Sequence, residues 1–520
     1  MSRRNSNILS GLLGSIPKCV RFHRRHVIGV MIGEIMNFSE VMREESKWTK
    51  TENGADAKNT TDSALLDMFA TIGSMRNRSE DEIIKKFELA FQEDSLGAMR
   101  CLFYAREIRG NGLGERRVFR VILPYIANKH LKELENNIFL IPEYGRFDDF
   151  YYLIGTEAEE IVWEIIKEQL TEDQKSMIEN KPCSLLAKWL KKADASSPNT
   201  RKLGIYTAKK LGMSVYDYKR LCVKLRKYID VVEQRMSANE WDTINYPAVP
   251  SRAMMNYRKA FARHDEERFN EYLNKVQYGE QKINSSTLYP YDIVEKILYG
   301  HEDSKALEAQ WNNLPNYVDG DVNAVVMADV SGSMYGRPMA TSIGLAMYFA
   351  ERNKGAYHNL FMTFSGNPQF VELKGNTITE KIRFISRANW QMNTDLEKAL
   401  LKILDVAIEN HCSQEEMPKS LIIISDMEID RCTSQKHREN FCDYVSRVYE
   451  EHGYKIPNVV FWNVDSRYDV FLSDKNRKGV QLVSGQSAST CKNLIGCVDK
   501  TPVEMMYYVL NSELYQAMQL

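Results

Sequence analysis

Five oxygen-bearing side chains in the C-terminal half of the chain have the types and spacing of a binding site for a hard divalent cation. Asp329, Ser331 and Ser333 alternate within one short turn, and Thr394 and Asp426 follow later in the chain. Mg²⁺ prefers oxygen ligands in octahedral geometry and keeps several waters, so a few carboxylates and hydroxyls are enough to hold it. The sequence therefore predicts a divalent-cation site, with Mg²⁺ as the expected ion.

These side chains are expected at the carboxyl ends of buried strands or at the start of a helix. The apolar run 323–328 predicts a strand that ends at the first aspartate, and helical periodicity follows over 339–352. A second apolar strand, 420–426, ends at the last aspartate, and Thr394 stands where another helix opens. Because ligands of open α/β sheets bind just past the carboxyl ends of strands, the five side chains can converge there. The alternative is a polar turn in which Ser331 or Ser333 caps the following helix.

The rest of the C-terminal half alternates short apolar runs with helical segments. This order predicts a doubly wound, Rossmann-like sheet with an antiparallel edge strand. No Gly-x-Gly-x-x-Gly sequence follows a strand, so no dinucleotide is expected.

The set Asp329-x-Ser331-x-Ser333, Thr394 and Asp426 resembles the metal-ion-dependent adhesion site (MIDAS) of von Willebrand factor A (vWA) domains. The resemblance implies that Ser331, Ser333 and Thr394 coordinate the ion directly. It implies that Asp329 and Asp426 act mainly through water. The remaining position on the ion would accept an Asp or Glu carboxylate from a protein partner.

The composition limits the class of protein. The chain has 520 residues, 43% of them hydrophobic, and a formal net charge of −1 from 69 basic and 70 acidic residues. That length suits two or more domains, and the balanced charge means that any surface for nucleic acid must be local. No apolar run is long enough to span a membrane, and the 9 cysteines lack zinc-site spacing. We therefore expect reduced thiols in a cytoplasmic protein that contacts no membrane.

The N-terminal half predicts helices. Residues 1–35 are rich in arginine and are expected to be a basic, disordered extension. From 36 to 315, apolar residues recur at intervals of three and four and show no alternating strand pattern. Helices joined by short polar segments predict an antiparallel, all-α array of degenerate repeats.

Positive charge is concentrated in one part of this helical half. Twelve basic and two acidic residues lie between Cys183 and Tyr228, and aromatic residues are interleaved with them. Clustered Lys and Arg neutralise phosphates, and aromatic rings can stack on unpaired bases, so the pattern favours RNA over a merely solvated basic face. The candidate RNA-binding residues are Lys191, Lys192, Arg201, Lys202, Lys209, Lys210, Lys219, Arg220, Lys224, Arg226 and Lys227.

A loop with three glycines and four arginines, Arg106–Arg117, is the second unusual segment of this half. Neither a preceding strand nor a following Lys-Ser/Thr accompanies it, so a nucleotide-binding loop is not expected. The loop is interpreted as an interhelical turn whose arginines contact either a polyanion or the nearby Glu107 and Glu115.

Several helical motifs resemble a poorly characterised family related to the Ro ribonucleoprotein, which also ends in a vWA domain. They are Thr51–Gly54 followed by Ala64–Asp67, the Gly-rich loop, Gly145–Asp149 and Ser184–Leu190. The resemblance implies an all-α, HEAT-like (TROVE-like) repeat domain over 36–315. An α/β, Rossmann-like vWA domain with a MIDAS would follow over 316–520.

The resemblance implies a non-enzymatic RNA-binding protein of ribonucleoprotein type. It would hold small non-coding or misfolded RNA, including single-stranded ends, on its basic helices. Two other functions stay open: a protein–protein adaptor that uses the metal without RNA, and a metal-dependent phosphoesterase. No histidine lies within ten residues of Asp329, Thr394 or Asp426 to serve as a nearby general base, which argues against the enzyme.

Overall fold

The computed structural model describes residues 38–318, 322–364, 367–387, 395–431, 441–495, 497 and 499–520. The expected extension 1–35 and the candidate ligand Thr394 lie outside these residues. The chain divides into two units, Met1–Trp48 and Thr49–Leu520. In the first unit the structure describes one helix, α2 (Phe38–Ser46).

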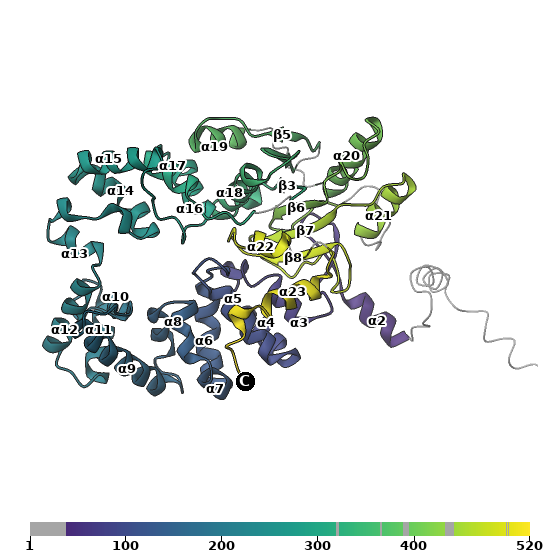
Figure 1. Ribbon diagram of the computed structural model, residues 1–520. Coiled ribbons are helices and arrows are strands. Elements are labelled where there is room, and N and C mark those ends of the chain that lie inside the picture. Colours follow the sequence, from purple (N-terminus) through teal and green to yellow (C-terminus); the bar gives the residue numbers. More distant parts are fainter. Residues whose placement is uncertain are drawn as a thin grey trace, which may run out of the picture. The chain divides into compact units, whose positions relative to one another are not determined.

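The N-terminal half of the second unit is mostly helical (Figure 1). Polar caps set where several helices begin: Ser79 and Glu82 form a reciprocal capping box on α4, and Ser197 and Ser214 cap α11 and α12. The helices are α3 (Ala64–Phe69), α4 (Glu80–Glu93), α5 (Ser95–Arg106), α6 (Arg117–Lys129), α7 (Leu131–Glu135), α8 (Ile141–Tyr144), α9 (Glu159–Ile178), α10 (Leu186–Trp189), α11 (Pro198–Lys210), α12 (Val215–Tyr228), α13 (Val232–Ser237), α14 (Ser251–His264), α15 (Glu266–Gln277), α16 (Pro290–Leu298) and α17 (Lys305–Asn312).

Two short strands precede these helices, where no strand was predicted. β1 (Trp48–Lys50) and β2 (Asp56–Lys58) form a two-stranded sheet. Strands of 3 residues are too short to show an alternating pattern, which explains why the sequence did not reveal them.

The C-terminal half is a mixed α/β sheet of six strands, as the alternating pattern predicted. The strand order is β5-β4-β3-β6-β7-β8, and every neighbouring pair is parallel except β4 and β5. The strands are β3 (Ala324–Ala328), β4 (Leu360–Thr363), β5 (Phe370–Glu372), β6 (Ser420–Ser425), β7 (Asn458–Asn463) and β8 (Val480–Ser484). The helices are α18 (Arg337–Arg352), α19 (Ile378–Arg387), α20 (Leu396–Glu409), α21 (Phe441–Glu451), α22 (Thr490–Ile495) and α23 (Pro502–Leu510).

The strand order reverses beside β3, because the chain passes from β3 to β4 on one side and later returns to β6 on the other. All five residues of β3 are buried, as its continuous apolar sequence predicted. The register places Ala328 opposite Ile424, so the two strands end side by side. Such a reversal point is where open α/β sheets place their ligands.

Both ends of the helical half contact the α/β part. Near its start, the Ser484 hydroxyl donates to the Phe69 carbonyl at 3.0 Å, and α23 packs on α3 and α5. At its end, α16 packs along α18 (Figure 1). The two halves therefore belong to one compact unit. Among the described helices, none combines the length and the apolar character needed to cross a membrane.

Candidate functional site

Two buried carboxylates meet at the carboxyl ends of β3 and β6. Asp329 follows β3 and Asp426 follows β6, and their side chains are almost fully inaccessible to solvent. The hydroxyl of Ser425 joins them: its Oγ donates to Asp329 Oδ2 at 2.6 Å and lies 3.5 Å from Asp426 Oδ1. Asp329 Oδ1 also accepts the Ser331 backbone N–H at 2.8 Å. Burial, and then the charge of Asp426, raises the pKa of Asp329 to about 6.

Two hydroxyls stand on the solvent side of these carboxylates. Ser331 Oγ and Ser333 Oγ are 3.0 Å apart. Ser331 precedes a short 3-10 helix, Gly332–Met334, but its side chain makes no capping bond, and α18 begins only after Gly336. The structure therefore does not show the alternative, in which the side chain of Ser331 or Ser333 caps the helix that follows. A Cβ added at Gly332 would meet no atom within 4 Å, so the space beside the serines is open.

The fifth predicted ligand, Thr394, lies in the stretch 388–394, outside the described residues. The residue after it is described. Asp395 caps α20 by accepting the Lys398 backbone N–H at 3.0 Å, so a helix does open directly after Thr394.

The donor set suits a hard cation. It consists of two carboxylates and two hydroxyls, all oxygen donors, at one edge of the sheet. Two adjacent buried carboxylates repel each other, and a bound cation would relieve that repulsion. Within the described residues, no group of three or more His, Cys, Asp or Glu side chains is arranged to hold a metal.

An arginine that the sequence analysis did not single out contacts this site. Arg467, in the loop after β7, places Nη2 2.8 Å from Asp426 Oδ2. Its Nη1 lies 2.9 Å from the Glu52 carboxylate, near the start of the helical half. The guanidinium therefore neutralises one side of Asp426 and links it to a residue far away in the sequence.

The segment Thr51–Gly54 lies on the loop that follows Asp426. The Thr51 hydroxyl donates to the Ile429 carbonyl at 2.7 Å, and the Glu52 backbone N–H donates to the Glu428 carboxylate at 2.6 Å. The Asn53 amide donates to the Glu428 carbonyl at 2.6 Å. The sequence motif Thr51–Gly54 thus packs beside the candidate metal centre.

The basic residues of the second candidate site come from α11, from α12 and from the segment that follows α10. Eight of the eleven predicted side chains are exposed: Lys192, Arg201, Lys202, Lys209, Lys219, Arg220, Lys224 and Lys227. Arg201 holds the turn before α11 by donating to the Ala195 and Ser196 carbonyls at 3.0 and 3.2 Å. Lys219 pairs with Asp194 at 2.9 Å.

Three of the predicted RNA-binding residues are committed to contacts within the protein. Arg226 is buried, and it donates to the Ala187 and Leu190 carbonyls at 2.8 Å each. Lys191 is half-buried, with Nζ 4.9 Å from the centre of the Tyr151 ring. Lys210 pairs with two glutamates at the start of α9. Arg226 is thus a structural residue that ties α12 to α10.

The Gly-rich loop is organised by Glu107. Its buried carboxylate accepts the backbone N–H groups of Asn111 and Gly112 at 2.7 Å each. Glu115 pairs with Arg76 at 2.8 Å. The loop is an interhelical turn, as predicted, but the contacts found for its arginine side chains lead to other residues than Glu107 and Glu115. Arg106 pairs with Asp149, and Arg109 donates to the Glu143 carbonyl.

By its fold, this protein belongs to the class that joins a long helical part to an α/β sheet, here of six strands. Its oxygen-rich site lies where the strand order of the sheet reverses. A family model described as "Domain of unknown function (DUF2828)" matches residues 51–181 and 172–320, and another described as "Domain of unknown function (DUF7788)" matches 323–507. The chain belongs to the DUF2828 family. It is also similar to "Uncharacterized protein L728" of Acanthamoeba polyphaga mimivirus. The two are 28% identical over 502 residues, which cover 88% of this chain and 86% of the viral protein.

Proposed function

We propose that this protein binds single-stranded RNA on the exposed face of α11 and α12. The observation that carries the proposal is a set of exposed cations on these two helices that have no acidic partners among the described residues. Lys209 on α11, and Arg220, Lys224 and Lys227 on α12, are exposed and form no ion pair there. Tyr216, 68% exposed, adds an aromatic ring to the same helix face.

The chemistry of this face matches a flexible polyanion. Arg220 lies 5.6 Å from the centre of the Tyr216 ring, so a guanidinium and an aromatic plane are presented together. Arg and Lys release counterions from phosphates, and an exposed ring can stack on any base. A double helix would offer only its backbone to such a face, whereas a single strand offers bases as well.

We propose that the C-terminal half is a vWA-like domain that binds Mg²⁺. Ser331 and Ser333 would hold the ion directly, together with Thr394, while Asp329 and Asp426 would act through water. The bound ion would supply an electrophilic position for a partner's carboxylate. The fit of the oxygen donors at the ends of β3 and β6 supports this assignment.

A kinship with the Ro ribonucleoprotein follows as part of the same proposal. HEAT-like helices followed by a vWA domain are the features on which it rests. The contact of both ends of the helical half with the α/β part supports it, because it allows the helices to frame a shared RNA-binding surface.

The RNA proposal is tested by charge reversal in the full chain. The variant carries Glu at Lys209, Arg220, Lys224 and Lys227, and affinity for a labelled single-stranded RNA is measured against salt. The matched control carries Glu at Lys305, Lys419, Lys455 and Lys478, which are equally exposed elsewhere. We expect the first variant to lose at least a hundredfold in affinity and the control to lose little. Equal losses would refute the proposal.

The metal proposal is tested by calorimetric titration with Mg²⁺ and Mn²⁺. Binding by the wild-type protein that is lost in Asp329→Ala supports a site at this edge of the sheet. If neither ion binds the wild-type protein, the metal centre is refuted. A co-purifying protein that EDTA releases, in the absence of RNA, would instead identify an adaptor.

A further inference from the structure

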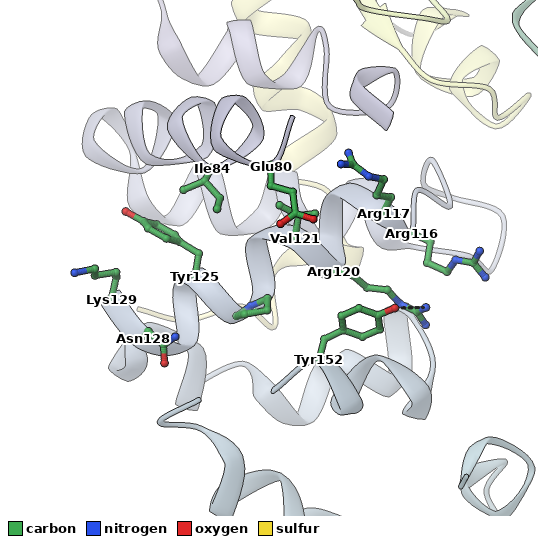
Figure 2. Close-up of a pocket in the computed structure, with 11 residues that line it drawn as sticks. Glu80, Ile84, Arg116, Arg117, Arg120, Val121, Tyr125, Asn128, Lys129 and Tyr152 are labelled. Carbon is green, nitrogen blue, oxygen red and sulfur yellow. Dashed lines mark hydrogen bonds between the residues drawn. The ribbon is translucent and has the colours of Figure 1, made fainter. Parts of the chain in front are cut away.

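A groove along α6 shares no lining residue with either site described above. It has a volume of about 720 Å³ and is lined by α6, by the start of α4 and by Tyr152 (Figure 2). The lining residues are Glu80, Ile84, Arg116, Arg117, Arg120, Val121, Pro124, Tyr125, Asn128, Lys129 and Tyr152. Four cations and one acid therefore surround an apolar and aromatic floor.

The helix divides its residues between the core and this groove. Val118, Phe119, Ile122 and Leu123 are buried in the core, so the residues between them face outward. Two outward residues, Val121 and Pro124, are apolar. Figure 2 shows Arg116 and Arg117 at one end of the helix and Lys129 at the other. The rise of an α-helix puts these ends about 18 Å apart.

One cation is fixed in place by the fold. Arg120 donates from Nε to Asp149 at 2.6 Å and lies over the Tyr152 ring, with its central carbon 4.6 Å from the ring centre. Asp148 and Asp149 neutralise the charge of Arg120. Arg120 therefore positions Tyr152 beside the groove and is not available to pair with an anionic ligand. Tyr152 is exposed and presents its ring to the solvent side.

The other cations are free to bind an anion. Arg116 and Lys129 are exposed and form no ion pair among the described residues. Arg117 donates once, to the Arg78 carbonyl at 2.9 Å, which leaves the rest of its guanidinium for a ligand. Pro124 has no N–H, so the carbonyl of Arg120 lacks its helical donor and can accept from a ribose hydroxyl or base amino group.

We infer that this groove is a second binding site for single-stranded RNA, in which bases lie on the Tyr125, Tyr152 and Val121 surface while phosphates meet the cations at its two ends. The inference rests on the proposed function and extends it to another helix. The occupant is a strand rather than a free nucleotide, because free cations stand at both ends of a helix about 18 Å long. The apolar floor between them favours stacked bases over a protein's acidic side chains.

The test uses the full chain with Arg116→Glu and Lys129→Glu combined. The matched control combines Lys132→Glu and Lys167→Glu, exposed lysines that do not line the groove. Fluorescence anisotropy with a 20-nucleotide single-stranded RNA is followed against salt concentration, and unfolding temperatures confirm that both variants fold. We expect a loss of about tenfold or more for the groove variant and no loss for the control. The salt dependence should weaken by a slope of about 1.4, as for two lost phosphate contacts.

A second measurement does not depend on charge reversal. Photocrosslinking of wild-type protein with 4-thiouridine-containing RNA should yield adducts on peptides that contain Tyr125 or Tyr152, and excess UMP should not suppress them. Unchanged affinity in the groove variant, or crosslinks confined to α11 and α12, would overturn the inference and leave the proposed function standing. Suppression of the crosslinks by UMP alone would also overturn the inference, because the groove would then take a nucleotide and not a strand. Absence of RNA binding by the wild-type protein would overturn both the inference and the proposed function.

Discussion

Arg467 and Asp426 form an ion pair at the candidate metal centre, with Nη2 2.8 Å from Oδ2. The same guanidinium holds Glu52 at 2.9 Å, so the pair connects the sheet edge to the start of the helical half. A positive side chain on a metal-binding carboxylate competes with the ion and repels it. Arg467 is therefore expected to set the affinity of the site for a divalent cation.

Removal of this guanidinium should tighten metal binding. We expect Arg467→Ala to lower the Kd for Mn²⁺ about tenfold, equivalent to about 1.4 kcal/mol, as measured by calorimetry. Arg467→Lys keeps a positive charge near Asp426 and should change the Kd less. A weaker affinity in Arg467→Ala would mean that Arg467 supports the site instead of competing for it.

The raised pKa of Asp329 predicts how stability depends on pH without a metal. The pKa of Asp329 is about 6 in the folded protein, against about 3.9 for an unfolded Asp. The folded state therefore favours the protonated carboxyl group, and this contribution to stability is complete only at a pH below the unfolded pKa. That contribution is lost as pH rises through 6. At pH 7.5 the ionised carboxylate should therefore cost about 2–3 kcal/mol. Asp329→Asn, which mimics the neutral acid, should then be more stable than the wild-type protein.

The measurement is chemical unfolding in EDTA at pH 7.5 and pH 5. The advantage of Asp329→Asn should shrink at pH 5. Saturating Mg²⁺ should stabilise the wild-type protein and leave the variant unchanged, since ligands stabilise only the state they bind. A variant that is less stable than the wild type at pH 7.5 in EDTA would contradict the prediction.

A carboxylate with the opposite behaviour joins the helical half to the α/β part. Asp469 Oδ1 lies 2.7 Å from Arg78 and 2.8 Å from Lys86, both buried cations. Burial raises the pKa of Asp469, but Lys86 and Arg78 together outweigh burial and lower it below its usual value. Its stabilising effect is thus present above the unfolded pKa and is lost as pH falls through the lower, folded pKa.

We expect Asp469→Asn to reduce the free energy of unfolding by about 1–3 kcal/mol at pH 7, because two buried cations lose their partner. The difference from wild type should persist at pH 5 and shrink below about pH 4. Asp443→Asn, at an exposed carboxylate that pairs with the half-buried Arg477, serves as the control and should cost less. Equal losses in both variants at pH 7 would show that burial of the cations does not matter.

Local patterns in the sequence predicted the strands and their ends well. The runs 323–328 and 420–426 are continuous and apolar, and the structure has β3 and β6 there, side by side and in register. The acids that follow them therefore converge, as predicted. Arg467 and Glu52 could not be found this way, because each is one charged residue in a polar segment, and only the tertiary fold brings them to Asp426.

Arg226 shows a different limit. Arg226 was included among the candidate RNA-binding residues because of its charge alone, although its spacing along the helix indicates a buried position. Tyr218, Cys222 and Leu225 are the buried residues of α12, and Arg226 lies four positions after Cys222, on the same face. Periodicity placed Arg226 towards the core. The two carbonyls that it reaches lie in α10 (Ala187) and directly after it (Leu190), and the sequence pattern alone could not show that this segment packs against α12.

This position gives a final prediction that separates structure from RNA binding. Arg226→Ala would leave the Ala187 and Leu190 carbonyls without their donor in a buried setting, at about 1–3 kcal/mol each. We therefore expect urea unfolding to report a loss of about 2–6 kcal/mol, with only part of it recovered in Arg226→Lys. The adjacent Lys227→Ala, at an exposed residue, should leave stability unchanged and weaken RNA binding. If Arg226→Ala were as stable as the wild-type protein yet failed to bind RNA, Arg226 would have to leave its buried place and contact the phosphates.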